Sequence, residues 1–264
     1  MLISLSLGMV VGCIMGLTGA GGGILAVPLL VFGLHFTVAQ ASPIGLLAVG
    51  IAAAIGAAMG LRKGIVRYRA AGLIAAVGIV LAPAGFWLAR QLDTRYLTML
   101  FAIVLLGVAY KSVREGMRRP GEEPDRPEFP CVRFTESGKF IWTKKCAARL
   151  SAIGGLAGLL SGLLGVGGGF VIVPALQRIT DLTMQSIVAT SLAVIALISL
   201  VSVAGSIYGG HFDYAAGFPF AAGAALGTLV AGRYASRWPG RHLKFVFGIV
   251  CSLVALGLFV KSAG

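Results

Sequence analysis

Charged side chains are scarce in this sequence. They make up 12% of the 264 residues, whereas about a quarter of a soluble domain is charged. The first one is Arg62, so about sixty residues precede it without any charge, roughly three times what one helix needs to cross a bilayer. This pattern argues against a soluble domain and predicts an all-α, polytopic membrane protein.

Acidic residues are the scarcer charged class, and none falls in the middle of a predicted span. Of the nine, six lie in one central charged segment, and the others are Asp93, Asp181 and Asp213. Proton-coupled transporters commonly carry a carboxylate or histidine inside the membrane, so we do not expect a carboxylate relay. Neither a nucleophile with its base nor a metal-ligand set is visible. We therefore expect no enzyme, no metal site and no cofactor.

Cysteine is also rare, with four residues in the whole chain. Cys13 and Cys251 lie in apolar spans, and Cys131 and Cys146 lie in the central charged segment. None forms a CxxC pair, so the spacing favours neither a disulfide framework nor a zinc site. We interpret all four as small apolar residues or cytosolic thiols.

What the chain has in excess is positive charge, with a net charge of +13. In a soluble protein this would suggest nucleic acid, but here Lys and Arg lie in short segments between apolar spans. That distribution is typical of cytoplasmic loops facing anionic lipid. We expect the lipid bilayer as a partner and no nucleic acid.

A glycine-rich motif occurs twice. GLTGAGGGILAVPLL at 16–30 and GLLGVGGGFVIVPAL at 162–176 share nine of fifteen positions. A shift of 146 positions also superposes glycines 8, 12 and 16 on glycines 154, 158 and 162, and Tyr68 on Tyr214. The chain is therefore a duplicated unit.

The segment between the two copies differs sharply in composition. Residues 111–149 hold ten Lys or Arg and six Asp or Glu, with four prolines, and such a segment buries too little apolar surface to fold alone. We predict a first transmembrane repeat at 1–112, a charged cytoplasmic linker at 113–146 and a second transmembrane repeat at 147–264.

The charges of equivalent loops predict that the two repeats are inserted upside down relative to each other. The loop at 62–69 carries four positive residues and its counterpart at 208–215 carries none, whereas 88–98 carries two and 234–244 carries three. Inversion needs an odd number of segments in each repeat. A broken helix hairpin at each glycine motif, followed by three transmembrane helices, provides five. The alternative is eight plain helices in a parallel repeat.

Three consecutive glycines destabilise a helix by about 1 kcal/mol each relative to alanine, so each GGG run predicts a helix break. In inverted-repeat transporters such breaks lie near the midplane, where helix N-termini direct free N–H groups at an anion. We predict substrate contacts from Gly19, Gly21, Gly22 and Gly23 and from Gly165, Gly167, Gly168 and Gly169. The six glycines of the two four-residue-spaced rows we interpret as close helix packing.

Polar clusters follow each motif at the start of the next helix. They contain Gln40 and Ser42 in the first repeat and Thr190 and Ser191 in the second, while Thr18 and Ser161 flank the breaks. Hydroxyl and amide donors suit an oxyanion, so we include these six residues in the candidate site. The alternative is that each hydroxyl bonds its own helix backbone.

The twin GLTGAGGGILAVP and GLLGVGGGFVIVP motifs, the AQAS and VATS clusters and the chain length together resemble the TauE/SafE family of sulfite exporter-like bacterial permeases. The resemblance implies a multi-pass protein of the bacterial cytoplasmic membrane that moves sulfite, a sulfonate or a related organosulfur or organic acid. Pro43, after Gln40 and Ser42, departs from the second cluster, where Leu192 follows Ser191.

Two classes of function stay open from the sequence. The first is an exporter of a small anion bound at the paired glycine breaks. The second is a scaffold or receptor that does not transport and acts through the linker. A homodimer is also left open.

Overall fold

The computed structural model describes residues 2–18, 22–117, 131, 143–209, 212–234 and 240–263, with the backbone alone at 115, 116, 233, 234, 240–244 and 260–263. These residues form α-helices, one 3₁₀ helix and one isolated bridge between Cys131 and Thr180, and no strand occurs among them. The predicted all-α fold is therefore confirmed.

The first repeat begins with two short α-helices, with a 3₁₀ helix between them, and continues with three long α-helices. In chain order they are α1 (Leu2–Thr18), η1 (Gly22–Leu25), α2 (Ala26–Gly33), α3 (Val38–Arg62), α4 (Tyr68–Gln91) and α5 (Thr94–Met117). The second repeat follows the same order with α6 (Lys144–Leu164), α7 (Gly169–Ile179), α8 (Met184–Tyr208), α9 (Tyr214–Tyr234) and α10 (Gly240–Ala263).

Helix starts are fixed by equivalent residues in the two repeats. The hydroxyl of Thr37 accepts a hydrogen bond from the Gln40 N–H at the start of α3, and Thr183 accepts one from the Ser186 N–H at the start of α8. Thr37 and Thr183 are 146 positions apart, so the duplication extends to the capping residues that satisfy the free N–H groups of a helix end.

Six helices within the described residues are long and apolar enough to cross a membrane: α3, α4, α5, α6, α8 and α9. Their outward side chains are large and apolar, with Val80 73%, Leu200 70% and Ile103 57% exposed. A soluble protein rarely exposes so many apolar side chains. This surface suits lipid, and the chain is a multi-pass membrane protein.

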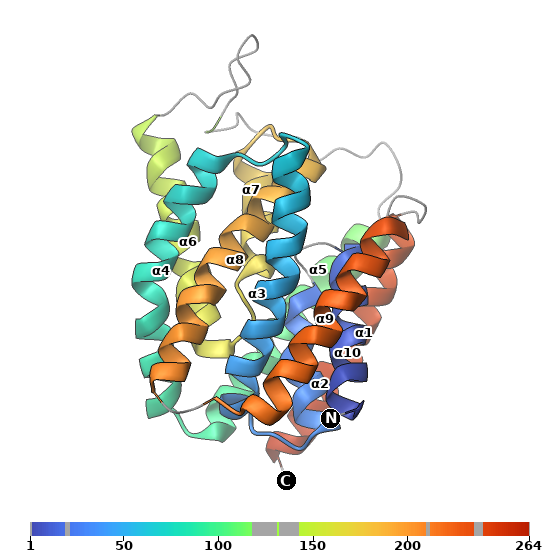
Figure 1. Ribbon diagram of the computed structural model, residues 1–264. Coiled ribbons are helices and arrows are strands. Elements are labelled where there is room, and N and C mark those ends of the chain that lie inside the picture. Colours follow the sequence, from blue (N-terminus) through green and yellow to red (C-terminus); the bar gives the residue numbers. More distant parts are fainter. Residues whose placement is uncertain are drawn as a thin grey trace.

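Figure 1 shows where the helix ends lie. α1 begins and α10 ends at the lower end of the bundle, whereas α6 begins at the upper end. The equivalent helices α3 and α8 pack together in antiparallel directions, because Gly50, Gly56 and Gly60 face Ser199, Leu192 and Ala189 in turn.

Small residues set the closest helix contacts. A Cβ atom at Gly8 or Gly12 of α1 would collide with the carbonyl oxygen of Phe220 or Ala224 on α9, and one at Gly158 of α6 would collide with that of Gly78 on α4. These contacts are equivalent in the two repeats: Gly12 on Ala224 in the α1–α9 pair corresponds to Gly158 on Gly78 in the α6–α4 pair, and equivalent residues are 146 positions apart. The predicted packing role of the spaced glycines is confirmed.

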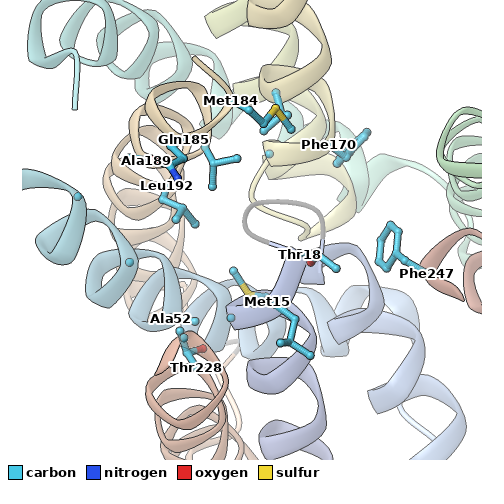
Figure 2. Close-up of a pocket in the computed structure, with 18 of the residues that line it drawn as sticks. Met15, Thr18, Ala52, Phe170, Met184, Gln185, Ala189, Leu192, Thr228 and Phe247 are labelled. Carbon is cyan, nitrogen blue, oxygen red and sulfur yellow. The ribbon is translucent and has the colours of Figure 1, made fainter. Parts of the chain in front are cut away.

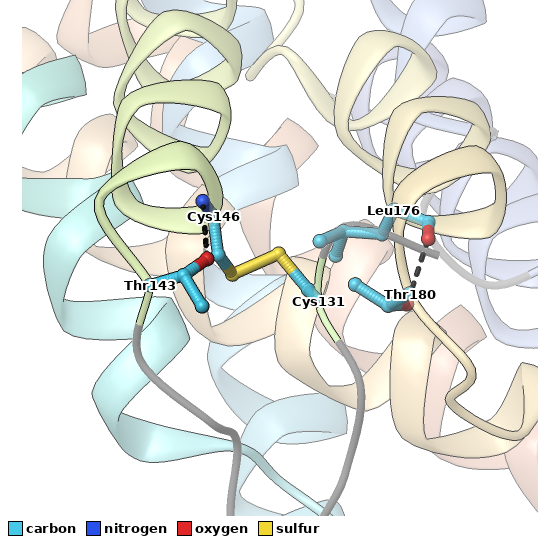
Figure 3. The surroundings of a disulfide bond; sticks show 5 residues. All are labelled: Cys131, Thr143, Cys146, Leu176 and Thr180. Carbon is cyan, nitrogen blue, oxygen red and sulfur yellow. Dashed lines mark hydrogen bonds between the residues drawn. A yellow bond between two sulfur atoms is a disulfide. The ribbon is translucent and has the colours of Figure 1, made fainter. Parts of the chain in front are cut away.

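The interpretation of Cys131 and Cys146 as thiols is wrong, because the two form a disulfide (Figure 3). The Cys131 N–H donates to the Ile179 carbonyl oxygen at 3.1 Å, and the Thr143 hydroxyl accepts from the Cys146 N–H. The backbone contact with Ile179 places Cys131 beside Cys146. The spacing of the two cysteines in the sequence did not indicate this pairing. Cys13 and Cys251 are free, as expected.

Candidate functional site

The second glycine motif is a sharp break between α6 and α7. Gly165 caps α6 with φ 70°, and Gly167 and Gly168 follow with φ 75° and 69°. Side chains other than glycine rarely adopt these values. Gly169 is the first residue of α7, and the Gly168 carbonyl oxygen accepts from the Val171 N–H at 3.0 Å.

The first glycine motif takes a different form. Gly22 and Gly23 begin the 3₁₀ helix that leads into α2, where we expected them to lie in the break itself. A Cβ atom on Gly22 would lie 2.6 Å from the Met15 nitrogen, so the chain turns back tightly against α1. The predicted site residues Gly19 and Gly21 lie outside the described residues.

The two breaks meet near the middle of α3. A Cβ atom at Gly23 would lie 3.5 Å from the Val166 carbonyl oxygen, and the Val49 side chain would lie 3.0 Å from Cβ atoms at both Gly23 and Gly167. Ser42 packs against Gly165 so closely that a Cβ there would collide with it. The structure therefore brings together Gly23, Gly165, Gly167 and Ser42 from the predicted set.

Several predicted polar residues bond the backbone. The hydroxyls of Thr18, Ser42 and Ser191 donate to the carbonyl oxygens of residues 14, 38 and 188 at 2.7, 2.8 and 2.9 Å. A hydroxyl whose proton is used in this way offers only lone pairs to a ligand, which suits an anion poorly.

Gln40 and Thr190 have structural partners. The Gln40 side-chain oxygen accepts from the Thr37 N–H at 3.1 Å in an exposed capping box, away from the breaks. The Thr190 hydroxyl accepts from the Arg67 N–H at 3.1 Å and, together with the Ser186 hydroxyl on the Ile65 carbonyl oxygen, fastens the α3–α4 loop to α8.

A cavity of about 600 Å³ lies between the two repeats (Figure 2). Its walls come from the last turn of α1, from α3 and α5, and from α7, α8, α9 and α10. It reaches from Lys63, just after α3, to Ala52 near the middle of that helix, a depth of roughly 16 Å at 1.5 Å per residue. Thr18 and Gly169, next to the two breaks, also line it.

The cavity has positive charge at its mouth and an apolar interior. Lys63 and Lys111 are the charged residues of its lining, and no acidic side chain lines it within the described residues. Figure 2 shows Met15 and Thr18 on one side and Phe170 and Phe247 nearby. A site with lysines and without carboxylates attracts anions and repels cations.

Sequence reasoning missed the cavity lysines and two buried hydroxyls, those of Ser199 and Ser202. In the sequence, Lys and Arg were used only to predict the orientation in the membrane. In the structure, Lys63 after α3 and Lys111 near the end of α5 line the same cavity as residues of α7. A signal for Ser199 existed: it is a polar residue inside the long apolar helix α8, where Ala53 is its counterpart in the first repeat.

Comparisons with known proteins agree with this architecture. The family model for the sulfite exporter TauE/SafE matches residues 4–258. A "probable membrane transporter protein" of Xylella fastidiosa (strain 9a5c) is 28% identical over 269 residues, covering 99% of this chain and 96% of the relative. The "probable membrane transporter protein YunE" of Bacillus subtilis (strain 168) is 22% identical and covers 96% of this chain and 97% of the relative.

No solved structure gives a significant match. The family match spans nearly the whole chain, and these relatives carry transporter names. The chain is a membrane transporter and not an enzyme, and it belongs to the sulfite exporter TauE/SafE family.

Proposed function

We propose that this transporter exports a small anion, with sulfite, a sulfonate or a related organosulfur or organic acid as substrate. The observation that carries the proposal is the cavity between the repeats, which has lysines at its mouth and the ends of both glycine breaks in its walls. Across a bacterial cytoplasmic membrane, an inside-negative potential favours anion exit by about 2.3 kcal/mol per charge per 100 mV.

The transport path follows from the shape of the cavity. Its lining runs from Lys63, after the upper end of α3 in Figure 1, to Ala52, which is one turn from Val49, where Gly23 and Gly167 approach each other. The breaks close the way to the lower end, so the anion crosses when the two short hairpins move and open the other side. Irregular backbone of this kind is tolerated in a membrane where it lines such a path.

We further propose that the two repeats are inverted and that the end of the bundle with Lys63 faces the cytoplasm. The antiparallel packing of α3 on α8 supports inversion, and Lys and Arg are retained on the cytoplasmic side. The disulfide alone would favour an oxidising compartment. We give the loop charges more weight, because two pairs of equivalent loops both favour this orientation, whereas cytosolic disulfides also form in redox-sensing proteins.

The orientation is tested by single-cysteine labelling in intact cells. A cysteine at Gly64, in the α3–α4 loop, should react only after the membrane is permeabilised. One at Asp213, just before α9, should react with an impermeant reagent from outside. The reverse pattern would overturn the assigned orientation, and the same pattern at both positions would overturn the α3–α4 and α8–α9 topology.

Flux in proteoliposomes tests the transport function. Val188→Trp places an indole in the cavity, and we expect it to reduce sulfite or sulfonate flux about tenfold or more, the effect of roughly 1.4 kcal/mol or more. Leu200→Trp is the matched control, since Leu200 lies on the same helix, is 70% exposed and faces lipid. Equal flux in both variants would place the path elsewhere.

A further inference from the structure

Three buried hydroxyls in the second repeat, those of Ser161, Ser199 and Ser202, have no hydrogen-bond partner within the described residues, and the first two belong to fully buried residues. Ser161 on α6 and Ser199 on α8 are both 0% exposed, and their Oγ atoms are without a partner in the part of the chain that the structure describes. Other buried hydroxyls behave differently: Ser206 donates to the Ser202 carbonyl oxygen at 3.0 Å, and Thr180 donates to that of Leu176 at 2.7 Å.

The hydroxyls of Ser161 and Ser199 belong to helices that flank the second break. The Ser161 carbonyl oxygen accepts the Gly165 N–H at 2.9 Å, which puts Ser161 one turn before the break. A Cβ atom at Gly167 would lie 3.6 Å from the Ser199 Oγ. Ser199 also approaches α3 closely, since a Cβ at Gly50 would lie 2.9 Å from the Ser199 Cβ.

Leaving a buried hydroxyl without a partner costs stability, and proteins usually avoid it. A serine in a helix can satisfy itself by bonding the carbonyl oxygen of the preceding turn, as Ser42 and Ser206 do. Two serines that both forgo this bond next to the same glycine break indicate donors held ready for a ligand.

We propose that the hydroxyls of Ser161 and Ser199 donate hydrogen bonds to an oxyanion oxygen of the substrate as it passes the second break. This inference rests on the proposed anion transport and names the residues that contact the anion. Hydroxyls bind an oxyanion without a fixed positive charge, so the anion is held weakly enough to leave on the far side.

The cavity explains why the ligand is an anion. A serine hydroxyl also accepts, and the carbonyl oxygens of Gly165 and Val166 lie near Gly45 and Gly23, so a cation could use the same groups. A cation would first have to pass Lys63 and Lys111 without an acidic side chain in the described lining to offset them. The lysines favour an anion at this mouth.

Ser161 and Ser199 lie beyond the residues that line the cavity. The lining includes Gly169 and Phe170, directly after the break, but neither serine. Both hydroxyls are therefore closed off from the cavity in this conformation. They mark the occluded part of the path, between the cavity and the lower end of the bundle.

Alanine variants test the inference by their transport KM for sulfite. We expect Ser161→Ala and Ser199→Ala each to raise KM about tenfold, the usual loss for one hydrogen bond to a charged group. Neither variant should melt at a lower temperature than the wild type, since no protein hydrogen bond is lost. The matched control is Ser206→Ala, which removes a buried, bonded hydroxyl from the same helix as Ser199 and should leave KM unchanged.

Other outcomes separate this inference from the proposed function. Unchanged KM in both variants, with flux still blocked in Val188→Trp, would overturn the role of the serines and leave anion transport in place. A change in sodium dependence at unchanged sulfite KM would also overturn it, in favour of a cation site. Absence of wild-type flux for sulfite, sulfonates and carboxylates would instead overturn the proposed function.

Discussion

The two glycine breaks are built alike and differ in chemistry. In each repeat the first helix packs its glycines against the fourth helix of the other repeat, at positions 146 residues apart. At the second break, however, Ser161 and Ser199 present hydroxyls, where the first repeat has Met15 and Ala53. The two repeats therefore share their glycine packing, whereas the buried hydroxyls at these two positions occur in the second repeat alone.

The same contrast applies to charge. Lys63 and Lys111 line the cavity from the first repeat, and their counterparts in the second repeat are Gly209 and Gly257. Within the described residues, the positive charge of the cavity lining thus comes from the first repeat alone. A symmetric pair of repeats has become a transporter with one charged mouth and one hydroxyl-bearing break.

The largest expected effect concerns the shared packing. Gly12→Leu and Gly158→Leu should both abolish the folded state, because each side chain would collide with a backbone carbonyl, of Ala224 or Gly78, which cannot move aside as a side chain does. The cost should exceed the roughly 1 to 3 kcal/mol that is usual for overpacking. Gly72→Leu is the control, since nothing lies within 4 Å of a Cβ atom there. Size-exclusion profiles and melting temperatures in detergent measure the effect.

Folding of one glycine variant but not the other would break the equivalence of the two repeats. An equal loss of the folded state in both variants would support the equivalence, because the two repeats would then share their glycine packing and differ only in their polar residues.

A smaller effect concerns the disulfide, which only the second repeat has at its start. Cys131→Ser should lower stability by about 3 kcal/mol, the model value for a loop of this size, since the bridge spans 15 residues. Thermal melts of the variant, of the reduced wild type and of Cys13→Ser as control give the comparison. An unchanged melting temperature in Cys131→Ser would contradict a structural role for the bridge.

The smallest effect concerns the mouth of the cavity. Lys63→Gln and Lys111→Gln should each raise the KM for sulfite about two- to fivefold, and more at low ionic strength, because charges near the surface attract an anion weakly and are screened by salt. Lys145→Gln, at the exposed start of α6 and outside the lining, is the matched control. An effect as large at Lys145 as at Lys63 would mean that only the overall charge matters.

Much of the fold was predictable because membrane helices are long apolar segments and because the two repeats align at a constant shift of 146 positions. The helix break predicted at the second GGG run lies between α6 and α7, at Gly165 to Gly168. The six span-length helices among the described residues include α3, α4, α5, α8 and α9, which follow the glycine motifs as predicted, and also α6, which we expected as part of a broken helix hairpin.

The site was predicted only in part, because local sequence does not say which donor is already bonded. Ser42 and Ser199 look alike in sequence, yet the first donates to Val38 and the second is unpartnered. Gln40 looked like an anion ligand and is a helix cap. Such differences depend on packing between helices far apart in the chain, as does the pairing of Cys131 with Cys146.

The most direct test of anion transport is charge movement on a solid-supported membrane. Rapid addition of sulfite or a short sulfonate to wild-type proteoliposomes should produce a transient current with the sign of a moving anion. The current should be lost in Val188→Trp and retained in Leu200→Trp. Absence of current and of tracer flux in the wild type for every sulfur oxyanion, sulfonate and carboxylate tested would contradict the account.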